Sequence, residues 1–142
     1  MKTLLIDNYD SFTYNLYQII AELDGCLPTV LKNDDYAGWM DLDMSQIGAV
    51  VVSPGPGSPA LENDFGISRL ALEQTTQPLL GVCLGHQGLC YFAGGEISYA
   101  PEPVHGRLSD IYHSCDGLFE GIPSPFSAVR YHSLVARDLP ET

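Results

Sequence analysis

Cys83 stands between two glycines in the segment Leu80-Gly-Val-Cys-Leu-Gly-His-Gln87, between an apolar run and a helix-compatible run, 84–93. A reactive side chain between glycines at a strand-to-helix turn is typical of a nucleophile elbow. The glycines permit the tight turn because neither carries a Cβ. The positive end of the following helix favours the thiolate, which is the nucleophilic form of cysteine. The alternative is that Cys83 is a small buried apolar residue, as most free cysteines are.

A second candidate element is the glycine- and proline-rich segment Ser53-Pro-Gly-Pro-Gly-Ser-Pro59. Such a rigid turn leaves the backbone N–H groups of Gly55 and Gly57 free, and an oxyanion hole needs preorganised donors of this kind. The second donor would be the N–H of Leu84, the residue after the nucleophile. A plain sharp loop is the alternative. A phosphate-binding loop is disfavoured, because no Gly-Lys-Ser/Thr sequence follows.

Three histidines could be taken for the base that activates Cys83. His86 lies three residues further along the same predicted helix, where its Cβ points along the helix and not back to the elbow. We therefore interpret His86 as structural. His105 and His132 are interpreted as hydrogen-bonded loop histidines.

Short apolar runs alternate with segments of helical spacing over the first two thirds of the chain, which predicts a parallel α/β sheet with right-handed crossovers. The predicted strands are residues 4–6, 29–31, 49–52 and 79–82, and the predicted helices are residues 12–23, 67–74 and 84–93. Reactive groups of such sheets lie at the carboxyl ends of the strands. Asp7-Asn8, Ser53-Pro54 and Cys83 should therefore converge on one region.

The pattern changes after residue 95. Three segments carry β-forming residues, 96–99, 107–112 and 126–130, with turns expected at Pro101-Glu-Pro103 and Asp116-Gly117. This part is predicted to form antiparallel additions to the sheet.

The composition is that of one globular domain of 142 residues with 18 acidic and six basic side chains, a formal net charge of −12. This charge argues against nucleic acid or an anionic membrane surface as a partner. The four cysteines show no metal-ligand spacing, so neither a metal nor another cofactor is expected. No apolar stretch has the length of a membrane span or a signal peptide, and a cytoplasmic location is the default expectation.

Five segments together carry a family resemblance. They are LLIDNYDSFTYNL, SPGPGSP, GVCLGHQ, PVHGR and RYHSL, in that order between Leu4 and Leu134. This combination resembles the class I glutamine amidotransferase domain, in the branch that serves chorismate-using enzymes. The resemblance implies a flavodoxin-like α/β fold with helices on both faces of the sheet. It also implies that glutamine is hydrolysed through a γ-glutamyl thioester and that the ammonia passes to a chorismate-binding synthase component or fused domain.

The resemblance also assigns roles to single residues. Cys83 becomes the nucleophile, and Gly57 and Leu84 become the oxyanion donors. Glutamine would contact the positions Gly55, Gly57, Gln87, Ser133 and Leu134, the last two at its α-carboxylate and amino end. Asp10, Ser11 and Asn15 would lie near the entrance that faces the partner.

One feature departs from the family pattern. The family's catalytic His and Glu belong to a His-Pro-Glu segment downstream of RYHSL, and this chain has no such segment before its last residue, Thr142. We therefore interpret residues 1–142 as an amidotransferase domain that is incomplete at its C-terminus, with the last part of the sheet missing. The chain alone is then expected to be inactive, because its thiol lacks a base.

Within the branch, residues 100–107 and 122–126 resemble two-domain aminodeoxychorismate synthases more than anthranilate synthases. This resemblance implies the glutaminase portion of such a synthase, which serves 4-aminobenzoate and folate synthesis. Anthranilate synthase component II, which serves tryptophan synthesis, is the close alternative. A non-catalytic module that binds glutamine or a partner is the alternative from another class.

Overall fold

The structure is a computed structural model and describes residues 2–139. These residues divide into two compact units. The first contains residues 2–97 and 136–139, and the second is Ser98–Val135.

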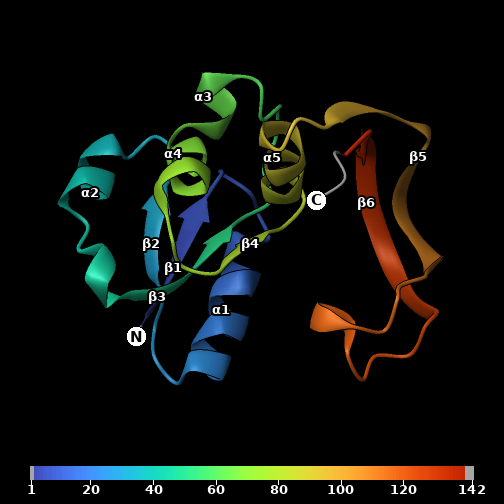
Figure 1. The fold of residues 1–142 in the computed structure, drawn as a ribbon, viewed down its shortest axis with the longest axis horizontal. Helices are drawn as coiled ribbons and strands as arrows, with labels where there is room; N and C mark the ends of the chain where they lie inside the picture. The colour runs from blue at the N-terminus through green and yellow to red at the C-terminus, as the bar shows by residue number, and fades with distance from the viewer. Residues whose placement is uncertain (1, 140–142) are drawn as a thin grey trace. The chain divides into compact units, whose positions relative to one another are not determined.

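The first unit is built on a parallel sheet of four strands, shown side by side in Figure 1. Its strands are β1 (Lys2–Asp7), β2 (Thr29–Lys32), β3 (Ile47–Val52) and β4 (Leu79–Gly81), in the spatial order β2-β1-β3-β4. All three pairings are parallel. This order is the flavodoxin-like one, so the predicted fold class and the four predicted strands are confirmed.

Five helices connect the strands: α1 (Thr13–Asp24), α2 (Tyr36–Asp41), α3 (Glu62–Phe65), α4 (Ile67–Gln74) and α5 (Leu84–Phe92). The spacing of apolar residues predicted α1, α4 and α5. The short helices α2 and α3 were missed. A signal for α2 was present, because the carboxylate of Asp35 caps its first turn and accepts a hydrogen bond from the Gly38 N–H at 2.8 Å.

The core lies between one face of the sheet and the helices α2 to α5. Strand residues such as Leu4, Ile6, Val50 and Val52 are fully buried there, and Phe65 packs in the same cluster. Full burial of a side chain of this size contributes about 1.5–3 kcal/mol. Residues between these positions point to the opposite face of the sheet, and α1 packs on β1.

The C-terminal part of the chain forms a two-stranded antiparallel sheet from β5 (Glu96–Ile111) and β6 (Phe126–Arg137). The predicted turn at Pro101-Glu-Pro103 is wrong, because β5 runs through these residues without a break. A strand tolerates proline where its missing N–H faces an unpaired edge, and each strand of a two-stranded sheet has such an edge. Short 3₁₀ turns, Met44–Gln46 and Gly117–Phe119, complete the elements.

Candidate active site

Cys83 lies at the turn between β4 and α5, with backbone angles φ 52° and ψ −105° that a non-glycine residue rarely adopts. The flanking positions require glycine because a Cβ at either one would collide with backbone atoms. A Cβ on Gly85 would lie 2.4 Å from the carbonyl oxygen of Val52, and a Cβ on Gly81 would lie 2.4 Å from the backbone of Gly85. The strand and the helix therefore approach as closely as the elbow hypothesis requires.

The pKa of the Cys83 thiol is raised above its ordinary value, chiefly because burial disfavours the charged thiolate. The Leu84 N–H at the beginning of α5 lowers this pKa, and the negative charge of Asp10 raises it further. Part of the Cys83 surface remains exposed to solvent. The loss of hydration around the thiol nevertheless raises its pKa by more than the Leu84 N–H lowers it. The N-terminus of α5 therefore favours the thiolate as expected, through the Leu84 N–H, but burial and Asp10 outweigh it and the pKa of Cys83 is raised.

The segment Ser53–Ser58, called the glycine loop below, follows β3 and lies against the elbow. A Cβ on Gly55 would lie 2.5 Å from the Cβ of Asn8 and 2.8 Å from the Leu84 side chain. Gly57 has φ +86°, a conformation that favours glycine. The structure therefore brings together Asn8 after β1, the glycine loop after β3 and the first residue of α5. This meeting of strand ends was predicted from the sequence.

Gln87 lies one turn after Cys83 on α5, and its N–H donates to the Cys83 carbonyl at 2.9 Å. Its side chain is buried and forms no hydrogen bond with the other described residues. The amide atoms of Gln87 are not among the buried polar atoms that lack a partner, so they reach solvent, and the role of Gln87 in binding glutamine stays a prediction.

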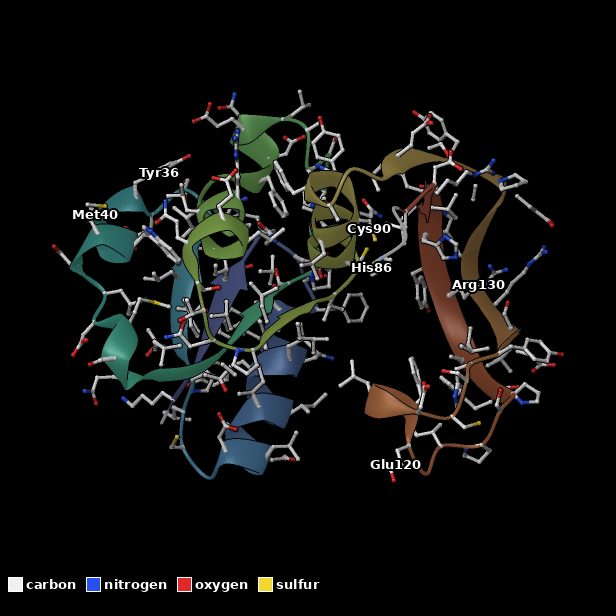
Figure 2. The ribbon with its side chains drawn as sticks, viewed as in Figure 1. Tyr36, Met40, His86, Cys90, Glu120 and Arg130 are labelled. Atoms are coloured by element: carbon white, nitrogen blue, oxygen red, sulfur yellow. The ribbon has the colours of Figure 1, made fainter. Side chains whose placement is uncertain are left out.

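The side chain of His86 contacts another residue of α5 and not the elbow. Its Nε2 lies 3.5 Å from the Sγ of Cys90, and Figure 2 shows the two side chains together on this helix. Burial raises the pKa of the Cys90 thiol. The interpretation of His86 as structural agrees with this contact.

The other two histidines lie in strands, not in loops. His132 is in β6, where Nδ1 lies 3.1 Å from the Leu134 carbonyl oxygen and Nε2 lies 3.4 Å from Nη1 of Arg130. It is hydrogen-bonded as predicted. His105 is in β5, and its ring has no hydrogen bond to another described residue.

Ser133 and Leu134 lie in β6, within the second unit, and both are half-buried. Cys83, Leu84, the glycine loop and Gln87 all belong to the first unit. The role of Ser133 and Leu134 in binding glutamine therefore stays a prediction.

The turn after β1 is organised by Asp7, which the sequence analysis did not single out for this role. Its buried Oδ1 accepts hydrogen bonds from the Tyr9 N–H and the Thr13 hydroxyl, both at 2.9 Å, and its Oδ2 lies 3.5 Å from the Lys32 ammonium. The turn presents Asp10, whose charge acts on Cys83. Two other candidates for the partner-facing entrance, Ser11 and Asn15, are exposed.

Residues 2–139 contain no group of three or more His, Cys, Asp or Glu side chains placed to hold a metal ion. No helix in this range is long and apolar enough to cross a membrane.

Comparison with known proteins gives consistent matches. The family model described as glutamine amidotransferase class-I matches residues 4–142. Aminodeoxychorismate synthase from Streptomyces pristinaespiralis is 57% identical over 140 residues, which make up 99% of this chain and 20% of that protein. Anthranilate synthase component 2 from Methanothermobacter marburgensis is 48% identical over 140 residues, covering 92% of this chain and 68% of that protein. The chain thus spans 16–20% of the length of the first aminodeoxychorismate synthases that it matches.

Solved structures share the fold. A glutamine amidotransferase from Thermotoga maritima superposes with a TM-score of 0.74 at 18% identity, covering 99% of this chain and 63% of that chain. A glutamine amidotransferase from Methylobacillus flagellatus gives a TM-score of 0.63 at 17% identity, covering 98% of this chain and 57% of that chain.

Proposed function

Because the chain belongs to the class I glutamine amidotransferase family, we propose that it is the glutaminase portion of an aminodeoxychorismate synthase. The observation that carries this proposal is the strained elbow that presents Cys83 beside the glycine loop. The 57% identity to the Streptomyces pristinaespiralis enzyme supports this branch of the family. Four free cysteines suit a cytoplasmic location.

In the proposed reaction, the Sγ of Cys83 attacks the γ-carboxamide carbon of glutamine. The N–H groups of Gly57 and Leu84 stabilise the oxyanion of the tetrahedral intermediate, and each such donor is typically worth about 3 kcal/mol. The thiol proton passes through a base to the leaving nitrogen, so that ammonia departs and a γ-glutamyl thioester remains. Water then adds to the thioester, releases glutamate and restores the thiol. A chorismate-binding synthase component uses the ammonia.

The proposed reaction also needs a general base. Burial and Asp10 raise the pKa of Cys83, which disfavours its thiolate, and residues 1–142 contain no His-Pro-Glu segment. General base catalysis contributes about 10²- to 10⁴-fold, so the chain alone should release almost no ammonia from glutamine. A chimera that adds the corresponding His-Pro-Glu segment of a relative should gain activity within that range. Robust ammonia release by the unmodified chain would mean that another group is the base.

Covalent labelling tests the nucleophile. A diazoketone analogue of glutamine should alkylate Cys83, forming an Sγ–C bond as N₂ leaves and the thiol proton moves to the reacting carbon. Peptide mass spectrometry then compares Cys83 with Cys26, Cys90 and Cys115, and Cys83→Ser is the matched control. Preferential labelling of any of the other three cysteines would overturn the assignment.

Anthranilate synthase component II remains a second candidate, because a relative of that class is 48% identical. Pairing with a synthase component distinguishes the two. With glutamine and chorismate, the chimera should support product formation by an aminodeoxychorismate synthase component, and chorismate should stimulate its glutamine hydrolysis. Productive pairing with an anthranilate synthase component instead, with release of anthranilate and pyruvate, would assign the chain to tryptophan synthesis. A chain that binds glutamine but supports neither product would be a non-catalytic binding module.

A further inference from the structure

Asn8 ties three elements together beneath the glycine loop. Its N–H donates to the Ser53 hydroxyl at 2.9 Å and its Nδ2 donates to the Ser53 carbonyl at 3.0 Å. Its Oδ1 accepts a hydrogen bond from the Ser68 hydroxyl at 2.8 Å. Asn8 is 1% exposed, and Ser53 and Ser68 are fully buried. The end of β1, the beginning of the glycine loop and the first turn of α4 are therefore joined by a satisfied buried network.

Asp64 holds the other end of the loop. Its Oδ2 accepts a hydrogen bond from the Ser58 N–H at 2.9 Å, and a Cβ on Gly57 would lie 2.1 Å from the same oxygen. Asn33, which directly follows β2 and is buried, donates from Nδ2 to the Asp64 carbonyl at 2.8 Å. The carboxylate of Asp64 therefore lies against both Gly57 and Ser58.

The middle of the loop is confined as well. Gly55 packs between Asn8 on one side and the Leu84 side chain on the other, with no room for a Cβ. Leu84 supplies the second oxyanion donor in the proposed reaction. The same contacts therefore set the position of the loop and its distance from the elbow.

We propose that Asn8 and Asp64 are positioning residues that clamp the glycine loop at its two ends and keep its oxyanion donor aligned with that of Leu84. Neither residue touches the reacting atoms. This inference rests on the proposed function, since it concerns the same oxyanion hole. A displacement of about 1 Å at such a site can cost about 100-fold in rate, so the clamp sets the efficiency of the reaction without taking part in it.

The test compares two alkylating reagents on the 142-residue chain. The chloroketone analogue of glutamine places its carbonyl oxygen in the oxyanion hole as Sγ displaces chloride and the thiol proton goes to solvent. Iodoacetamide also alkylates Sγ, displacing iodide, but does not depend on that hole. Both need the same thiolate, so the ratio of the two rates at Cys83 cancels any change in its ionisation.

Three variants break the clamp: Asn8→Ala, Ser68→Ala and Asp64→Ala. The matched control is Thr75→Ala, because Thr75 also lies by α4 and its hydroxyl donates to the Ala71 carbonyl at 2.7 Å, away from the loop. The clamp variants should lower the chloroketone rate about 10- to 100-fold while leaving the iodoacetamide rate within about twofold. If Asn8→Ala does not fold, Ser68→Ala and Asp64→Ala still decide the question.

The outcomes separate this proposal from the one on which it rests. If the wild-type chain shows no chloroketone preference at Cys83, the proposed function itself fails. If the wild-type chain shows the preference and the clamp variants keep it, the positioning role is overturned. An equal loss in Thr75→Ala would also overturn it, because the effect would then be general destabilisation.

Discussion

The two units of the chain bury their side chains very differently. In the parallel sheet, Leu4, Leu5 and Ile6 are all fully buried. In Ser98–Val135, Ala100 is the one buried apolar residue among those whose side chains are described, whereas Tyr99 is 80% exposed and Leu118 is 84% exposed. The parts of the candidate site that need accurate placement lie on the unit with its own core. The predicted contacts to the ends of glutamine lie on the unit without one.

Amide hydrogen exchange should show this contrast most strongly. Amides of β1 and β3 are held inside the core, so they should exchange only on unfolding of the unit, which costs about 5 kcal/mol or more. Amides of β5 and β6 belong to a two-stranded sheet, a structure of marginal stability by itself, and should open at far lower cost. Exchange measured peptide by peptide with mass spectrometry checks this. Equal protection of both sheets would contradict the comparison.

Glycine substitutions should separate the units next. In Gly85→Ala the new Cβ would lie 2.4 Å from a backbone oxygen of β3, which cannot move without displacing the strand. We expect a loss of about 3 kcal/mol or more in the free energy of unfolding. In Gly121→Ala the Cβ would meet nothing within 4 Å, and only the positive φ of 80° opposes it, at a cost of about 1 kcal/mol.

Denaturant unfolding measures both variants, and the diazoketone reagent then reports whether Cys83 is still presented. Gly85→Ala should lose the labelling and Gly121→Ala should keep it. Similar stabilities for the two variants would mean that the close approach at the elbow does not constrain the fold.

The sequence predicted those parts of the fold that depend on local patterns. Apolar runs predicted the four parallel strands. The two glycines around Cys83 predicted the elbow, because the sequence itself shows which residues lack a Cβ. The continuity of β5 through Pro101-Glu-Pro103 was not predicted. Prolines read locally as turn residues, and the unpaired edge that accommodates them is a property of the assembled sheet.

The candidate site was predicted less completely, for the same reason. The clamp joins Asn8 to Ser53 and Ser68, which lie 45 and 60 positions further along the chain. No rule of sequence spacing connects these three residues. The positions of Asn8 directly after β1 and of Asn33 directly after β2 could have indicated that both residues take part in the site. The ionisation of Cys83 depends on the balance between burial, the Leu84 N–H and Asp10, and only the folded arrangement sets that balance.

The smallest expected effect concerns this balance within the first unit. Asp10 raises the pKa of the Cys83 thiol through its negative charge, so Asp10→Asn should lower that pKa while leaving it above the ordinary value, because burial is the larger cause. At any pH below the pKa the thiolate fraction should then rise, and iodoacetamide should alkylate Cys83 a few-fold faster; one pKa unit would correspond to about tenfold.

The matched control is Asp43→Asn, which removes an exposed carboxylate that caps the turn before β3. The rate of Cys83 alkylation, followed against pH by peptide mass spectrometry, should shift to lower pH in Asp10→Asn and stay unchanged in Asp43→Asn. Because Coulombic effects at a partly exposed site are screened by salt, the shift should also shrink at high ionic strength. An unchanged profile in Asp10→Asn would mean that burial and the Leu84 N–H alone determine the ionisation of Cys83, and that the turn after β1 has no electrostatic influence on the nucleophile.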